Sequence, residues 1–89
     1  MADTTETTTR ELTDDAGRAW VALAVESKVA HLKNGAVLAF RAADEPEGEP
    51  VRSNVEFNSF EAAGFAIRTM SEKEIHRRLG WAKTDAGIP

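Results

Sequence analysis

Few side chains of this sequence belong to the types that build catalytic centres. The chain has two histidines, His31 and His76, and neither cysteine nor tyrosine. Nucleophilic catalysis needs a serine or threonine beside a histidine and an orienting acid. Two serines, Ser59 and Ser71, precede helical patterns and are expected to cap helices. The chain also lacks a nucleophile elbow and a His-Glu-x-x-His motif. We therefore expect no catalytic residue and a protein that is not an enzyme.

The same scarcity bears on metals and cofactors. Without cysteine there is no thiolate zinc site, and two histidines in different elements do not form a ligand set by themselves. The acids between Asp44 and Glu49 lack the spacing of an EF-hand loop. No glycine-rich loop is present that would cradle a phosphate. We expect neither a metal nor a cofactor.

The pattern with most functional content lies near the C-terminus. At 100° per residue, a helix over this region places basic side chains on one face and Ile75, Leu79 and Ala82 on the opposite face. Trp81 falls beside the basic arc. Tryptophan and arginine are the residue types that most often anchor protein interfaces. Together with a second tryptophan, the predicted partner-binding residues are Trp20, Lys73, His76, Arg77, Trp81 and Lys83.

Three interpretations of this basic face compete. It is an ordinary solvated face, a protein-binding surface, or a phosphate-contacting surface for nucleic acid; the last would use Lys73, His76, Arg77, Arg78 and Lys83. Residues 1–66 hold twelve acids and six bases, a sum of −6, while residues 67–89 hold three acids and five bases, a sum of +2, which together give −4. An acidic body repels polyanions and anionic lipid. We expect a small binding or adaptor module that contacts a protein, with a nucleic-acid-associated regulator as the alternative.

Alternating patterns before residue 58 predict a small antiparallel sheet of three or four strands, about residues 10–58. The clearest strand is Val51–Asn58, in which Val51, Val55 and Phe57 face the core. The stretch Arg18–Lys33 fits either a strand or a helix, and we favour the strand. Asn34-Gly35 is a strong hairpin signal between this stretch and Ala36–Ala42.

The hydrophobic period then changes to that of helices. Two C-terminal helices are predicted, about residues 59–70 and 71–83, capped by Ser59 and Ser71 and packed on one face of the sheet. Ser71 and Glu74 have the spacing of a capping box. Strands followed by helices indicate an α+β fold. A helix over 18–33 would instead give a hairpin among three helices.

Trp20 leaves two arrangements open. If Val21, Leu23 and Val25 face the helices, Trp20 lies on the opposite, open side of the sheet and forms a contact patch. If the Trp20 side faces the helices, the residue belongs to the core. An open sheet edge or an exposed Trp20 face would also allow the chain to form a homodimer.

The chain has 89 residues, which fits one domain. We expect it to span 10–84, between a disordered threonine-rich tail at 1–9 and a frayed end at 85–89. A core this small should contain most large apolar residues: Leu38, Phe40, Phe57, Phe60, Phe65 and Ile67. The longest apolar run, Ala19–Val25, is far too short to cross a bilayer, and no secretory signal is evident. These features, with the lack of cysteine, favour a cytoplasmic location.

Overall fold

Four antiparallel strands and two helices follow one another in the predicted order. The computed structural model describes residues 8–26 and 35–88. The elements are β1 Arg10–Thr13, β2 Ala19–Glu26, β3 Ala36–Ala42, β4 Val51–Phe57, α1 Phe60–Thr69 and α2 Glu72–Asp85. The predicted α+β class is confirmed.

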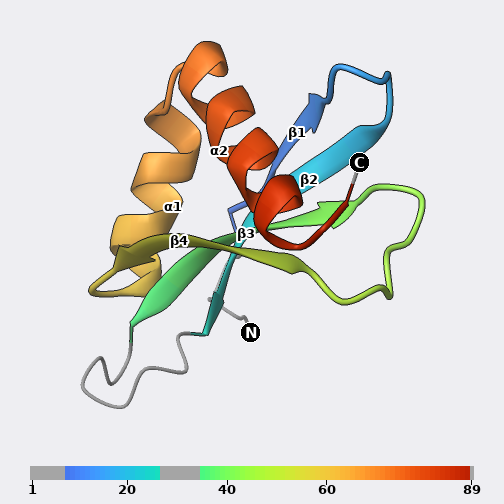
Figure 1. Ribbon diagram of the computed structural model, residues 1–89. Coiled ribbons are helices and arrows are strands. Elements are labelled where there is room, and N and C mark those ends of the chain that lie inside the picture. The colour runs from blue at the N-terminus through green and yellow to red at the C-terminus, as the bar shows by residue number, and fades with distance from the viewer. Residues whose placement is uncertain (1–7, 27–34, 89) are drawn as a thin grey trace.

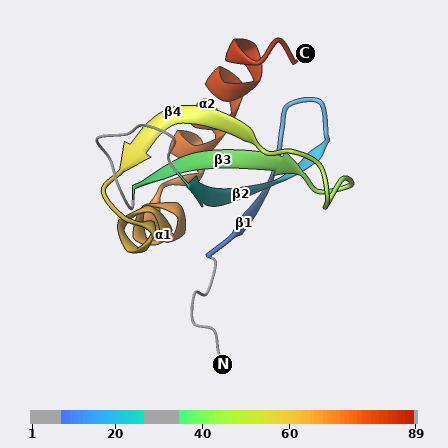
Figure 2. The same cartoon turned by 90° about the horizontal axis from the view of Figure 1, so that it is seen from below.

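The strands pair in sequence order, β1-β2-β3-β4, and lie side by side in that order (Figure 2). α1 and α2 pack on one face of this sheet (Figure 1). The turn between β1 and β2 contains Gly17 at φ +88°, a conformation that only glycine adopts without strain. This turn and α2 form the site described below.

The stretch that fitted either a strand or a helix is a strand over Ala19–Glu26, as favoured. In the β2–β3 register Glu26 opposes Ala36 and Trp20 opposes Ala42. This is not the register of a two-residue turn at Asn34-Gly35. Residues 27–34, which include His31, lie outside the described residues.

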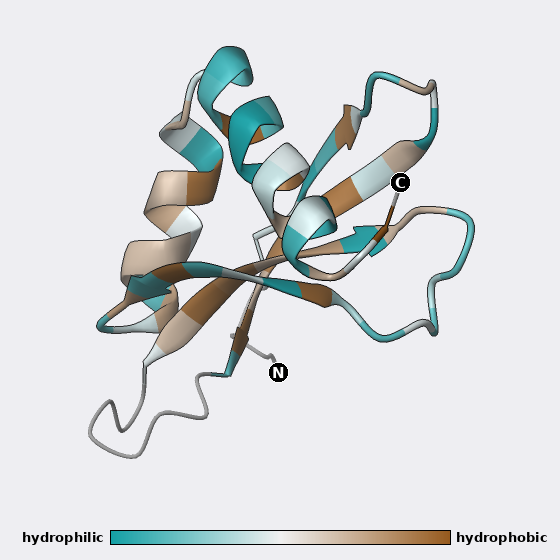
Figure 3. Cartoon of the chain, in the orientation of Figure 1, coloured by the Kyte–Doolittle hydropathy of each residue, from teal (hydrophilic) through white to brown (hydrophobic). Residues whose placement is uncertain are grey.

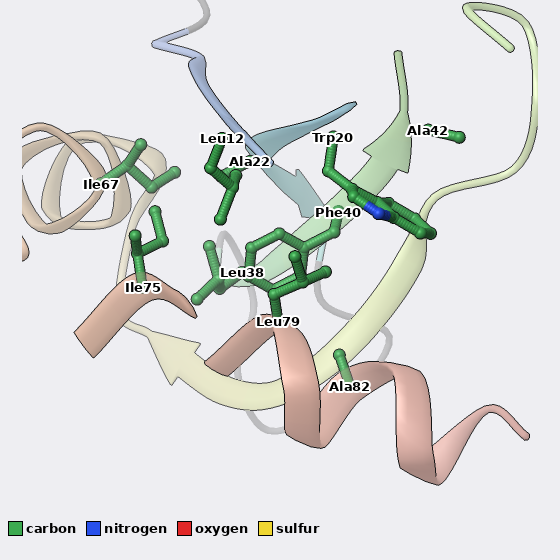
Figure 4. Close-up of a cluster of buried hydrophobic side chains, with 10 residues drawn as sticks. All are labelled: Leu12, Trp20, Ala22, Leu38, Phe40, Ala42, Ile67, Ile75, Leu79 and Ala82. Carbon is green, nitrogen blue, oxygen red and sulfur yellow. The ribbon is translucent and has the colours of Figure 1, made fainter. Parts of the chain in front are cut away.

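The core lies between one sheet face and the two helices (Figure 4). Leu38, Phe40 and Ile67 are fully buried, as predicted. Trp20 is only 2% exposed and lies in this cluster with Ala22. The Trp20 side of β2 therefore faces the helices, and the alternative of an exposed Trp20 patch is wrong.

Two predicted core residues are exposed instead. Phe60 is 50% exposed and Phe65 is 60% exposed, whereas Phe57 is partly buried against the core. Phe60 is the first residue of α1, and burial on that helix begins one turn later at Ala63. Phe65 lies 200° from Ala63 at 100° per residue, on the solvent side. Residue size led to the wrong prediction, because the position along α1 decides which of its side chains are buried.

The central strand β3 is buried on both faces, with Val37 6% exposed and Ala39 fully buried. The register of β4 against it shifts between Val37 and Ala39. Ser53 fills this irregularity: its Oγ donates to the Leu38 oxygen at 2.7 Å and accepts from the Val55 nitrogen at 3.1 Å. The polar groups of the bulge are thereby satisfied.

Both predicted helix caps are present. Ser59 Oγ accepts from the Ala62 nitrogen at 3.0 Å, and Ser71 Oγ accepts from the Glu74 nitrogen at 3.1 Å. The predicted return bond of the capping box is replaced, because the Glu74 carboxylate pairs with Arg77 and Arg78. The helix therefore starts where the sequence indicates, and Glu74 pairs with arginines of the following turn.

The C-terminal end of α2 differs from the predicted frayed end at 85–89. The Gly87 nitrogen donates to the Thr84 oxygen at 3.1 Å, and the Ile88 nitrogen donates to the Lys83 oxygen at 2.8 Å. With Gly87 at φ +75°, these bonds form a Schellman motif. At the other end of the chain, Thr8 falls inside the predicted tail, yet its Oγ1 lies 3.0 Å from where a Cβ on Gly64 would stand.

Candidate partner-binding site

The start of α2 is held by a side chain from β1. Arg10 Nη1 donates to the backbone oxygens of Ile67, at 3.0 Å, and Met70, and Nη2 lies 3.9 Å from Glu72 Oε2. Carbonyl groups at a helix C-terminus lack partners within the helix and carry partial negative charge. Arg10 therefore fixes the corner between α1 and α2 against the sheet.

Asp14, in the β1–β2 turn, holds the second half of α2. Its Oδ1 accepts from the backbone nitrogens of Ala16 and Arg18, at 2.9 and 2.8 Å, and its Oδ2 accepts from Trp20 Nε1 at 2.9 Å. Lys83 Nζ of α2 lies 2.8 Å from the same Oδ2, with side-chain exposures of 13% for Lys83 and 6% for Asp14. The Lys83 ammonium, followed by the Trp20 and Arg18 donors, holds the pKa of Asp14 well below its usual range. Asp14 is therefore an ionised anchor between the turn and the helix.

His76 forms a second link between α2 and the sheet. Its Nδ1 lies 2.9 Å from the Glu72 backbone oxygen, and its Nε2 lies 2.7 Å from the Thr13 backbone oxygen. A carbonyl oxygen only accepts, so both contacts are hydrogen bonds only when the ring is doubly protonated. These bonds, the Glu72 one foremost, raise the pKa of His76 above its usual value. His76 thus carries a positive charge more readily than a free histidine.

A concavity of about 400 Å³ lies between α2 and the β1–β2 turn. We call it the α2 concavity; its lining residues are Asp14, Asp15, Lys73, His76, Arg77, Leu79, Gly80 and Lys83. The structure thus brings together four of the six predicted partner-binding residues. The other lining residues, Asp14, Asp15, Leu79 and Gly80, were not among the predicted partner-binding residues.

The acidic residues of α2, Glu72, Glu74 and Asp85, lie outside the arc of the helix that faces solvent most directly. The residues that fall within one arc of about 100° on a helical projection are all exposed: Lys73, Arg77, Gly80, Trp81 and Thr84. We call this arc the outer face. Trp81 is 52% exposed, and Arg78 stacks on it with Cζ 5.3 Å from the ring centroid. Figure 3 shows hydrophilic residues along the first turns of the same helix.

Five of the six predicted residues divide into two groups, and the sixth, His76, is partly buried with both ring nitrogens facing backbone oxygens. Lys73, Arg77 and Trp81 are exposed and available to a partner. Trp20 is buried and Lys83 is neutralised by Asp14, so neither offers a free group; Lys83 Nζ instead lies 5.8 Å from the Trp20 ring centroid. This corrects the assignment of Trp20 to the partner-binding surface.

The described residues show neither a metal-binding cluster nor a membrane span. No group of three or more histidine, cysteine, aspartate or glutamate side chains there is arranged to hold a metal ion. No helix in residues 8–26 and 35–88 combines the length and the apolar character needed to cross a bilayer. That the chain needs no metal, cofactor or catalytic residue stays a prediction.

The fold and site together define a small α+β domain with a basic, tryptophan-bearing helix face. Comparisons with protein-family models, with curated proteins and with solved structures find no match for this chain. Its function is therefore argued from its own geometry.

Proposed function

We propose that this protein is a non-enzymatic binding module that contacts another protein through the outer face of α2. The observation that carries the proposal is Trp81. It is 52% exposed on a helix whose other large apolar residues, Ile75 and Leu79, are 1% exposed. Tryptophan is among the residues that contribute most to binding when a partner covers them. An adaptor needs no reactive group, which agrees with the scarcity of such groups in the chain.

The neighbours of Trp81 indicate the chemistry of the partner. Arg78 stacks on the indole ring, and Arg77 and Lys73 lie along the same exposed side of the helix. A complementary surface would offer an apolar pocket for the indole with carboxylates at its rim. We therefore propose a protein partner with an apolar, acid-rimmed surface. A second copy of this chain is one such candidate, because four acids are exposed between β3 and β4: Asp44, Glu45, Glu47 and Glu49.

No observation favours the nucleic-acid alternative. Of its five proposed contacts, Lys83 pairs with Asp14 at 2.8 Å and Arg78 pairs with Glu74 at 2.7 Å, while Arg77 contacts Glu74 at 3.3 Å and stays half exposed. Internally paired charges release few counterions on binding. The lack of cysteine fits a reducing compartment, so we propose that the contact takes place in the cytoplasm.

The test is affinity capture with the full chain and two variants. Trp81→Ala removes the proposed anchor, whereas Phe65→Ala removes an equally exposed aromatic residue from α1 and serves as the matched control. We expect one protein to be retained by the native chain and by Phe65→Ala and lost by Trp81→Ala, with little change between 50 and 200 mM salt. Equal retention by both variants would refute the proposed face.

Two further readouts separate the alternatives. Mass measurement in solution shows whether the partner is a second copy of the chain. Capture of DNA or RNA that weakens steeply across the same salt range, by up to about five-hundredfold for five phosphate contacts, would replace the proposal with the nucleic-acid alternative.

A further inference from the structure

We propose that the α2 concavity is a receptor site for a carboxylate group, presented by an acidic segment of the protein partner. The inference rests on the proposed function and adds the chemistry of the ligand. It starts from the concavity between α2 and the β1–β2 turn, which holds about 400 Å³. That volume accommodates a glutamate or aspartate side chain with its flanking backbone.

Two cations on the wall of the concavity are free to bind an anion. Lys73 is exposed and forms no ion pair with any described residue. The Arg77 side chain is 50% exposed, and its one ion pair within the described chain is the 3.3 Å contact with Glu74. A guanidinium has five donors, so most of its capacity remains for a carboxylate.

When protonated, His76 adds a third positive charge to this wall. Its two ring nitrogens face the backbone oxygens of Glu72 and Thr13, which favours the doubly protonated ring. Every charged group around the ring affects this proton. The Glu72 and Asp15 carboxylates favour it, Lys73, Arg77 and Lys83 oppose it, and Asp14 is neutralised by Lys83. A bound carboxylate would further favour the charged ring.

The charge of the lining favours an anion. With His76 protonated, four cations (Lys73, His76, Arg77 and Lys83) and two acids (Asp14 and Asp15) sum to +2. The proposed partner is a protein, whose own anionic side chains are carboxylates. The whole chain carries −4, which opposes a polyanion at longer range. A single carboxylate on a protein segment is therefore the group that fits best.

The experiment uses the full chain and a blocked peptide that contains a single glutamate, with inorganic phosphate as the competing probe. Binding is followed by NMR through the His76 ring and the backbone amides of Asp15 and Gly80. We expect peptide-dependent shifts at these three positions. Lys73→Ala and Arg77→Ala should each weaken binding about fivefold, while Arg68→Ala, on α1, should leave it unchanged.

The pH dependence of peptide affinity distinguishes a binding role of His76 from a purely structural one. The affinity for the peptide should fall as the pH rises from 5.5 to 8.5, and the peptide should in turn raise the pKa of His76, because the two effects are linked. In His76→Gln, the affinity should be the same at both pH values. Circular dichroism confirms that each variant is folded.

The outcomes separate the two proposals. Peptide binding that perturbs neither His76 nor Asp15, or that survives Lys73→Ala with Arg77→Ala, would overturn the carboxylate site. Phosphate binding as tightly as the peptide would also overturn it, in favour of a general anion site. Either result leaves the protein-binding proposal to be judged by Trp81→Ala in the capture experiment.

Discussion

One substitution made at two glycines of α2 should change stability in opposite directions. A Cβ added at Gly80 or at Gly87 would meet no atom within 4 Å, so new packing contributes at neither position. The difference lies in the backbone. Gly80 is an exposed interior residue of the helix, whereas Gly87 adopts φ +75° in the Schellman motif that ends it.

The magnitudes follow from these conformations. Alanine is favoured over glycine inside a helix by about 1 kcal/mol, so Gly80→Ala should stabilise the domain by about that amount. The left-handed conformation costs a residue with a side chain about 1–2 kcal/mol, so Gly87→Ala should destabilise the domain accordingly. The variants should thus differ by about 2–3 kcal/mol in the free energy of unfolding.

Urea unfolding followed by circular dichroism at 222 nm provides the measurement. Tryptophan fluorescence is unsuitable, because Trp81 is adjacent to Gly80 in sequence. Each 1 kcal/mol should move the thermal midpoint by about 4–8 °C in a domain of this size. The urea m-values should stay equal, since the exposed surface is unchanged. A shift of the same sign in both variants would show that the described end of α2 is wrong.

Three further predictions concern the contacts that hold the helices and the turn. Arg10→Ala should lower the free energy of unfolding by about 2 kcal/mol, because the Ile67 and Met70 carbonyls at the end of α1 lose a charged donor. Unchanged urea unfolding would contradict a stabilising role for these hydrogen bonds. Because the pKa of Asp14 is lower in the folded state than in the unfolded state, ionised Asp14 stabilises the fold above about pH 4. This stabilisation is lost as the pH falls through the pKa of Asp14 in the folded state. In Asp14→Asn, the free energy of unfolding should therefore fall less steeply as the pH is lowered. An unchanged fall would show that the Lys83–Asp14 pair does not stabilise the fold. Trp20→Ala should lower the free energy of unfolding by about 3–5 kcal/mol, because Trp20 is buried, and Phe65→Ala should lower it by less than about 0.5 kcal/mol, because Phe65 is exposed. Thermal unfolding measures both, and a larger effect of Phe65→Ala would contradict this difference in burial.

The features that the sequence predicts correctly are local ones. The serines before each helix identified both N-termini, and the alternation of β4 identified its core-facing side. The stripe Ile75, Leu79 and Ala82 emerged from the helical period alone. In each case the signal and the structure it specifies lie within a few residues of one another, so no knowledge of the rest of the chain was needed.

The features that the sequence does not give are those that depend on distant residues. Both sides of β2 are apolar, so the choice between a buried and an exposed Trp20 depends on which side the helices cover. Asp14 and Lys83 are 69 residues apart, and nothing in either neighbourhood indicates that they meet. Phe65 was misplaced because its size suggested burial, although its position on α1 placed it opposite Ala63.

This distinction matters most for the basic residues of α2. Counted along the sequence, Lys73, His76, Arg77, Arg78 and Lys83 form one positively charged surface suited to a polyanion. In the fold, Lys83 anchors the turn, His76 binds two carbonyl oxygens, and Arg78 lies between Glu74 and Trp81. What remains for a partner is a pair of cations beside one exposed indole. Two cations beside an aromatic ring resemble the charged rim and aromatic anchor of a protein interface. They suit a nucleic acid less well, because affinity for its phosphates depends on the number of unpaired positive charges.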